Sequence, residues 1–175
     1  MTNKLFIFIL TLFLLAGCET LKVNSSKLPT YDQKLGRVLI SVTAENYYLD
    51  ASLIGKNLAE KLAQRGIVTE VVVHKKLELE DPVKGALISF KPTQVLNVVF
   101  EREEDLDFGK YGMVISGYFK STIWDVSMRS TIWSSDAKLA LSNIGFGHDD
   151  NGANAKDFAD GLVKKLIVDG LLSTQ

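Results

Sequence analysis

The sequence predicts an α+β fold, a two-layer sandwich in which two helices pack on one face of an antiparallel or mixed β-sheet. Apolar and polar residues alternate in several segments after residue 36, which is typical of strands with one buried face. Two other segments carry apolar residues at helical spacing, and each ends in a glycine followed by an apolar residue. A chain of 175 residues is typical of one domain, which we expect to span residues 37–175.

Residues 1–17 differ from the rest of the chain and predict an export signal. Lys4 gives a positive charge near the start, and residues 5–16 are apolar except for Thr11. This run is shorter than the roughly 20 residues that a membrane-spanning helix needs, and it fits the apolar core of a secretory signal peptide.

The single cysteine of the chain, Cys18, stands directly after this run. Leu15-Ala16-Gly17-Cys18 resembles the bacterial lipobox. The resemblance implies that the signal is cut before Cys18, that the Cys18 thiol carries a diacylglycerol group, and that the new N-terminus is acylated. This covalent lipid is the only added group that we expect, because no cofactor motif is present. Two or more acyl chains attach a protein stably to a bacterial membrane.

Glu19 follows the cysteine where many inner-membrane lipoproteins of Gram-negative bacteria carry aspartate. The resemblance therefore implies an outer-membrane lipoprotein that faces the periplasm. Residues 18–36 are mostly polar and contain Asn24-Ser25-Ser26 and Pro29, which predicts a flexible tether between lipid and domain.

The domain is expected to begin with a strand, a helix and a second strand. Residues 37–44 alternate as a half-buried strand does. Asp50 stands where a helix N-cap belongs, and Gly66 supplies the residue that ends this helix. Residues 67–73 are rich in valine and other β-branched residues, which favours a strand.

The second half of the domain is expected to contain more strands and a closing helix. Residues 86–90 and 95–100 predict one interrupted strand or two short ones, because Pro92 cannot donate to a central ladder. The acidic segment 101–112 predicts a hairpin loop, and residues 113–124 and 130–141 predict two long strands. After a glycine-rich loop at 142–152, residues 153–170 predict the second helix.

The charge balance argues against nucleic acid as a partner. The chain has 20 basic and 21 acidic residues, and no basic run is longer than two lysines. We also expect no nucleotide, because Gly145-x-Gly147 lacks both the Lys-Ser/Thr of a P-loop and the spacing of a dinucleotide fingerprint.

Groups suited to catalysis are few, and we expect a protein that is not an enzyme. His148, Asp149 and Asp150 are weak candidates for a metal site, because imidazole and carboxylate can share one ion but no further His or Cys stands at ligand spacing. The alternative hypothesis is a membrane-tethered hydrolase or metal-dependent enzyme that uses this loop. Tyr47 and Tyr48 are candidate partner contacts, since aromatic residues are common at interface hot spots.

Taken together, the lipobox, the strand-helix-strand start, the pair of strands that carry Trp124 and Trp133, and the closing helix resemble small bacterial envelope lipoproteins. The architecture is similar to that of auxiliary lipoproteins of envelope transport systems, of the lipopolysaccharide-assembly lipoprotein and of the N-terminal domain of TolB. The resemblance implies a non-enzymatic accessory or binding module. Such a module would use a sheet edge or the groove between its helices to hold an envelope protein or a lipidic cargo.

Overall fold

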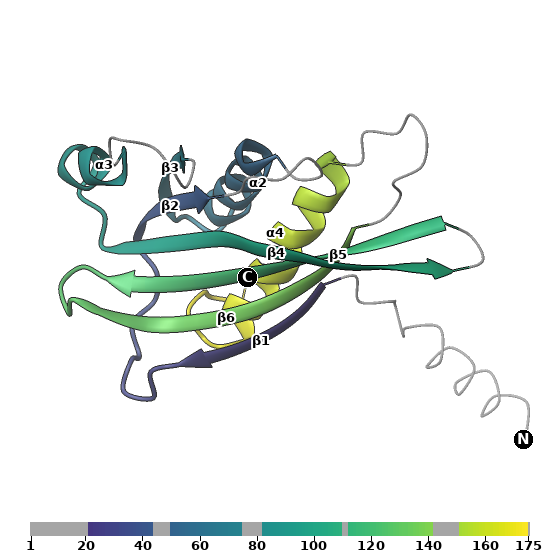
Figure 1. Cartoon of the computed structure of the whole chain (residues 1–175). Coiled ribbons are helices and arrows are strands. Elements are labelled where there is room, and N and C mark those ends of the chain that lie inside the picture. The colour runs from purple at the N-terminus through teal and green to yellow at the C-terminus, as the bar shows by residue number, and fades with distance from the viewer. Residues whose placement is uncertain (1–20, 44–49, 75–81, 110–111, 142–150, 175) are drawn as a thin grey trace, which may run out of the picture.

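The computed structural model describes residues 21–43, 50–74, 82–109, 112–141 and 151–174, and it confirms the α+β class (Figure 1). Its strands are β1 (Leu21–Lys27), β2 (Arg37–Thr43), β3 (Val68–His74), β4 (Gln94–Gly109), β5 (Gly112–Asp125) and β6 (Ser130–Leu141). Its helices in this part of the chain are α2 (Ala51–Ala63), α3 (Pro82–Phe90) and α4 (Asn151–Val168).

The strands form one six-stranded sheet in the order β1-β6-β5-β4-β2-β3. β2 runs parallel to both β3 and β4, whereas β4, β5, β6 and β1 pair antiparallel in succession. The sheet is therefore mixed, which decides between the two arrangements left open by the sequence. The expected strand-helix-strand unit is present as β2, α2 and β3.

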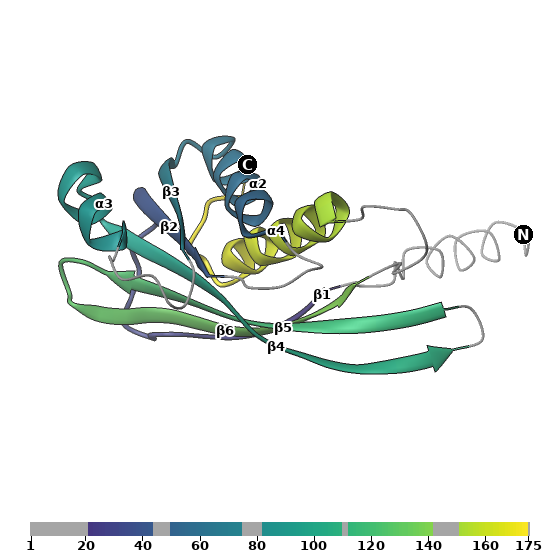
Figure 2. The same cartoon turned by 45° about the horizontal axis from the view of Figure 1, so that its top comes forward.

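The main core lies between the sheet and the two helices α2 and α4, which lie side by side on one of its faces (Figure 2). Phe158 of α4 is fully buried, and its ring centroid lies 4.4 Å from that of Phe119 on β5. Ile54 and Leu58 of α2 are buried as well. Apolar residues at helical spacing thus face alternate residues of the strands, as the pattern predicts.

Both helix ends follow the sequence prediction. The Asp50 carboxylate accepts a hydrogen bond of 2.7 Å from the Ser52 amide and so caps α2. Gly66 and Gly170 have φ angles of 76° and 77°, a left-handed conformation that glycine adopts without steric cost. The Ile67 amide donates to the Leu62 carbonyl at 3.1 Å, which completes the expected stop of the helix.

The segment expected to be a tether begins the fold instead. Within residues 18–36, Leu21–Lys27 forms β1 and pairs with β6 from Leu21↔Leu139 to Lys27↔Trp133. An edge strand is held largely by backbone hydrogen bonds to one neighbour, so it needs few apolar side chains and reads as polar linker. Residues 1–20, with the signal peptide and Cys18, lie outside the described residues.

Residues 86–90 do not form the expected strand but belong to the helix α3. Four apolar residues of this helix follow its period and pack with Leu39 and Val95, on the sheet face opposite α2 and α4; they are Val83, Ala86, Leu87 and Phe90. The helix begins at Pro82, and proline is common at the first position of a helix. The two expected helices pack on one face of the sheet, and a third helix, α3, packs on the opposite face.

Residues 101–112 are not a loop, because β4 continues to Gly109 and β5 begins at Gly112. β4 has its last partner on β2 at Val99, and β5 has its first partner on β6 at Ile115. The two strands therefore project beyond the sheet as a two-stranded arm, visible on the right of Figure 1. Residues 101–105 are all charged and show no apolar alternation, which is why this part of the strand is predicted as a loop.

In the described part of the chain, no helix combines the length and the apolar character that crossing a membrane requires.

Candidate binding groove between two helices

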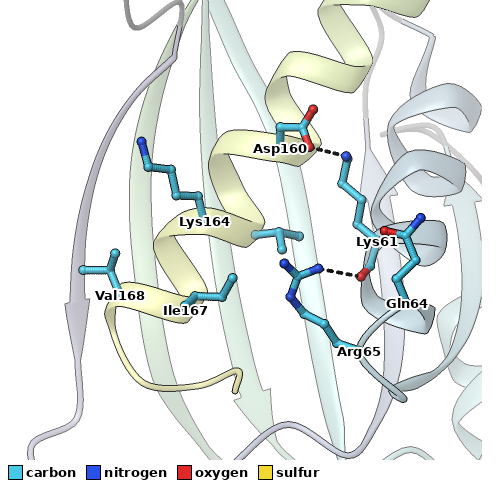
Figure 3. Close-up of a pocket in the computed structure, with 8 residues that line it drawn as sticks. Lys61, Gln64, Arg65, Asp160, Lys164, Ile167 and Val168 are labelled. Atoms are coloured by element: carbon cyan, nitrogen blue, oxygen red, sulfur yellow. Dashed lines mark hydrogen bonds and ion pairs between the residues drawn. The ribbon is translucent and has the colours of Figure 1, made fainter. Parts of the chain in front are cut away.

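The groove lies where the C-terminal half of α2 meets α4. It encloses about 510 Å³. Figure 3 shows side chains from both helices around it. The residues that line it are Lys61, Gln64, Arg65, Asp160, Val163, Lys164, Ile167 and Val168.

Close backbone packing fixes both helices that form the groove. A Cβ atom on Gly55 of α2 would stand 2.5 Å from Val71 Cγ1 on β3, so only glycine lets the helix approach this strand so closely. Gly161 of α4 lies against the Leu21 side chain of β1 in the same way. The two walls of the groove are therefore positioned by the sheet beneath them.

An ion pair crosses the groove between its walls. The Lys61 ammonium group of α2 contacts the Asp160 carboxylate of α4 (Figure 3). The Lys61 side chain is only 19% exposed, whereas that of Asp160 is 50% exposed. The pair fixes one end of the groove and leaves the carboxylate half open to solvent.

Arg65 brings a second cation to the groove. Its Nη1 donates to the Lys61 carbonyl at 3.2 Å, next to the end of α2. Its Nε is buried and has no hydrogen-bond partner among the described residues. A buried donor without a partner costs free energy, and an arriving acceptor would recover part of it.

The network beneath the last turn of α4 holds the other wall in place. The Asp169 carboxylate accepts hydrogen bonds from Trp133 Nε1 at 2.7 Å, Ser25 Oγ at 2.5 Å and Lys165 Nζ at 2.8 Å. Burial raises the pKa of Asp169, but the hydrogen bonds from Lys165, Ser25 and Trp133 together lower it below its ordinary value. Asp169 therefore stays ionised and joins β1, β6 and α4.

The lining combines positive charge with apolar surface. Lys61, Arg65 and Lys164 stand against the single carboxylate of Asp160, so the lining is positive overall. On α4, Val163 is buried, Ile167 is half-buried and Val168 is 71% exposed. These residue types suit a ligand that presents a carboxylate or phosphate beside an apolar group.

The candidate site residues of the sequence, Cys18, Tyr47, Tyr48 and His148 to Asp150, all lie outside the described residues. The described histidine, His74, places its Nε2 at 2.9 Å from Ser41 Oγ and 3.0 Å from Thr43 Oγ1. Within the described ranges, no three His, Cys, Asp or Glu side chains come together as a metal site would need. The metal hypothesis for His148, Asp149 and Asp150 stays a prediction.

The sequence predicts a groove between helices but does not identify its residues. One pattern could have indicated them: both helices carry a lysine shortly before their terminal glycine, Lys61 before Gly66 and Lys164 before Gly170. Cations in a last helical turn are commonly explained by the helix dipole alone. Only the packing of α2 against α4 brings them to one cavity.

No family model and no curated protein sequence matches this chain. Among solved structures, it is similar to a PelC dodecamer from Paraburkholderia phytofirmans, with 16% sequence identity and a TM-score of 0.55 over 89% of this chain and 99% of that chain. A PelC variant dodecamer from that organism gives 16% and 0.54, over 87% and 99%. Lipoprotein GNA1162 from Neisseria meningitidis gives 13% and 0.42, over 77% and 96%. The two PelC matches, with TM-scores above 0.5, show a shared fold.

Proposed function

We propose that this chain is a lipid-anchored accessory protein of the bacterial envelope, and that it binds a partner through the groove between α2 and α4. The anchor rests on the lipobox at Leu15-Ala16-Gly17-Cys18. The binding role rests on the groove, where three cations border an apolar wall of α4. The resemblance of the fold to PelC and to envelope lipoproteins is consistent with this role.

The partner that fits this groove presents an acidic group next to an apolar one. An acidic segment of an envelope protein or the head of a phosphorylated lipid has this chemistry. The Arg65 guanidinium group would receive the acidic group, since a guanidinium can hold carboxylate and phosphate in a bidentate manner. The apolar group would cover the exposed side chain of Val168.

The test is in-cell capture with a photocrosslinking amino acid placed at Val168. The matched control position is Ile88 on α3, which is 70% exposed and lies away from the groove. We expect one defined protein or lipid adduct from position 168 and none from position 88. The same abundant neighbours from both positions would argue against the groove as a binding site.

A charge variant separates binding from general surface contact. We expect Lys164→Glu to reduce the adduct at position 168, because it places a carboxylate beside the acidic group of the partner. Lys84→Glu, on the exposed side of α3, is the control and should leave the adduct unchanged. Equal adduct yields from both variants would remove the electrostatic part of the proposal.

We further propose that the chain assembles with copies of itself. The protein of similar fold in Paraburkholderia phytofirmans is described as a dodecamer. β1 and β3 end the sheet and offer backbone edges to a neighbouring copy. Analytical ultracentrifugation of the lipoprotein in detergent should show a defined oligomer, and a monomer at every concentration would contradict assembly without affecting the anchor.

A further inference from the structure

The sheet face opposite α2 and α4 is polar over β5, β6 and β1. Side chains alternate along each strand, so Phe119 and Leu139 enter the core while Tyr118 and Lys138 point to the other face. The helix α3 covers this second face only near Leu39 and Val95. We call the remainder the open face.

Three cations and a tyrosine form one row across the open face. The strand register pairs Arg102 with Tyr118, Tyr118 with Lys138, and Lys138 with Lys22. Neighbouring strands lie about 4.8 Å apart, so the row crosses four strands in about 14 Å. The Arg102 guanidinium carbon lies 4.7 Å from the Tyr118 ring centroid, and Lys138 Nζ lies 5.2 Å from it.

The row is exposed and positive overall. Arg102, Lys138 and Lys22 are all exposed. Glu104 neutralises part of this charge, because its carboxylate lies 2.9 Å from Arg102 Nη2. In the adjacent row Lys120 stands opposite Asp136, which leaves that row balanced.

The lipid anchor would hold this row close to the bilayer. Lys22 comes only four residues after Cys18, and a fully extended chain covers at most about 3.6 Å per residue. The two Cα atoms are therefore no more than about 14 Å apart. This upper limit leaves Lys22 free to approach lipid headgroups to within the roughly 8 Å over which charges attract in physiological salt.

We propose that the row of Arg102, Lys138 and Lys22 docks on anionic phosphate headgroups of the bilayer that holds the Cys18 lipid. This inference rests on the proposed lipid anchor. It turns the open face toward the membrane, and the groove between α2 and α4, on the opposite side of the sheet, toward the periplasmic space. Each basic residue near an anionic bilayer strengthens binding by about fivefold.

The test uses the native lipoprotein in vesicles of phosphatidylcholine alone or mixed with anionic phosphatidylglycerol. A lysine-reactive reagent and mass spectrometry measure the accessibility of each lysine. We expect Lys22 and Lys138 to react several times more slowly in the anionic vesicles, and high salt to abolish the difference. Lys56 and Lys156, which are exposed on α2 and α4 on the other side of the sheet, are internal controls and should react equally in both.

The double variant Lys22→Glu/Lys138→Glu tests the row directly. Both side chains are exposed, so we expect the fold to persist, and the protection of the neighbouring Lys120 should disappear in anionic vesicles. The matched variant Lys56→Glu/Lys156→Glu, on the other side of the sheet, should retain it. Equal reactivity of Lys22 in both vesicle types would overturn the inference, as would protection by a soluble anionic polymer and not by anionic lipid.

The mass of the Cys18 peptide in the same samples separates this inference from the proposed function. Acylated Cys18 without protection of the row contradicts membrane docking and leaves the anchor standing. Unmodified Cys18 contradicts the anchor. In that case, anionic vesicles added to the protein test the row alone, and they should still protect Lys22 and Lys138 if the row binds headgroups.

Discussion

At the scale of single residues, two carboxylates, the buried Asp125 and the partly buried Asp169, connect parts of the fold that are distant in sequence. Asp169 joins β1, β6 and the end of α4. Asp125, at the end of β5, accepts hydrogen bonds from the Tyr31 hydroxyl at 3.0 Å and from Gln94 Nε2 at 3.3 Å, and its second oxygen receives the Ser127 amide. Each carboxylate therefore fixes the end of an element that other elements pack against.

Replacing Asp169 by Asn should destabilise the protein by about 2 kcal/mol, because hydrogen bonds to a charged group contribute about 1.5–3 kcal/mol. Urea unfolding of the variant would measure this loss. Asp136→Asn is the control, since Asp136 is exposed, and it should change the free energy of unfolding by no more than about 0.5 kcal/mol. Equal effects from the two variants would show that the Asp169 network does not stabilise the fold.

Acid should destabilise the protein through the same two groups. Burial raises the pKa of Asp125, but hydrogen bonds from Met128, Ser127, Tyr31 and Gln94 lower it below the ordinary value of 3.8. Because the folded pKa values of Asp125 and Asp169 are depressed, their stabilisation is complete above the ordinary carboxyl pKa and is lost as pH falls through the lower folded values.

Thermal unfolding followed from pH 7 down to pH values below 3.8 would reveal this loss. Asp125→Asn cannot ionise, so its melting temperature should fall less steeply with acid than that of the wild type. A parallel fall in both proteins would contradict the assignment to Asp125.

At the scale of elements, glycines show how position decides the effect of one methyl group. Gly66 has a φ of 76°, where an added Cβ is strained even though it meets no atom within 4 Å. Gly85 lies inside α3, and a Cβ there also meets nothing. Space is therefore equal at the two sites, and only backbone conformation differs.

We expect Gly66→Ala to destabilise the protein by about 1–2 kcal/mol, the cost of a left-handed conformation for an L-residue. Gly85→Ala should stabilise it by about 0.5–1 kcal/mol, because alanine has the higher helix propensity. Chemical denaturation of both variants checks the two signs. A stabilising Gly66→Ala would mean that the end of α2 does not require this conformation.

The elements also show what the sequence could and could not predict. The β2-α2-β3 unit and both helix stops were predictable because their signals are local: alternation, the Asp50 cap and the terminal glycines. α3 is not predicted, because residues 86–90 form a short apolar run that suits a strand as well as a buried helix. The strand β1 is not predicted, because its polar side chains depend on a distant partner, β6. In the arm the pairing partners are close in sequence, but the charged residues 101–105 show none of the alternation that marks a strand.

The groove shares with β1 this dependence on segments that are distant in sequence. Lys61 and Arg65 lie at the C-terminal end of α2, and Lys164 lies on α4, about a hundred residues later in the chain. Their charges are readable in the sequence, but their meeting depends on α2 packing against α4. The sequence also does not indicate that Gly55 and Gly161 allow the two helices to contact the sheet closely.

At the scale of the whole molecule, the sheet separates two surfaces. Figure 2 shows α2 and α4 on one side of the sheet. The groove lies between these helices, and the cationic row lies on the opposite face of the sheet. β1, which begins three residues after Cys18, belongs to the sheet itself and not to a long linker. A lipid at Cys18 would therefore keep the domain against the bilayer, with little freedom to stand away from it.

The anchor can be tested on the intact protein. Mass spectrometry of the protein isolated from its host should find an N-terminal Cys18 with acyl chains. Cys18→Ala should accumulate the uncut precursor that retains residues 1–17, because the thiol is the group that receives the lipid. A wild-type product with residues 1–17 attached or with a free Cys18 thiol would contradict the proposed anchor.

The pairing of β1 also imposes an order on biogenesis. The strand β1 pairs with β6, where Leu21 stands opposite Leu139. Ser25 of β1 also donates a hydrogen bond to Asp169, which lies close to the end of the chain. Nearly the whole polypeptide must therefore be available before this strand can pair and complete the sheet. Under the proposed export and lipidation, processing at Cys18 could then precede the pairing of β1.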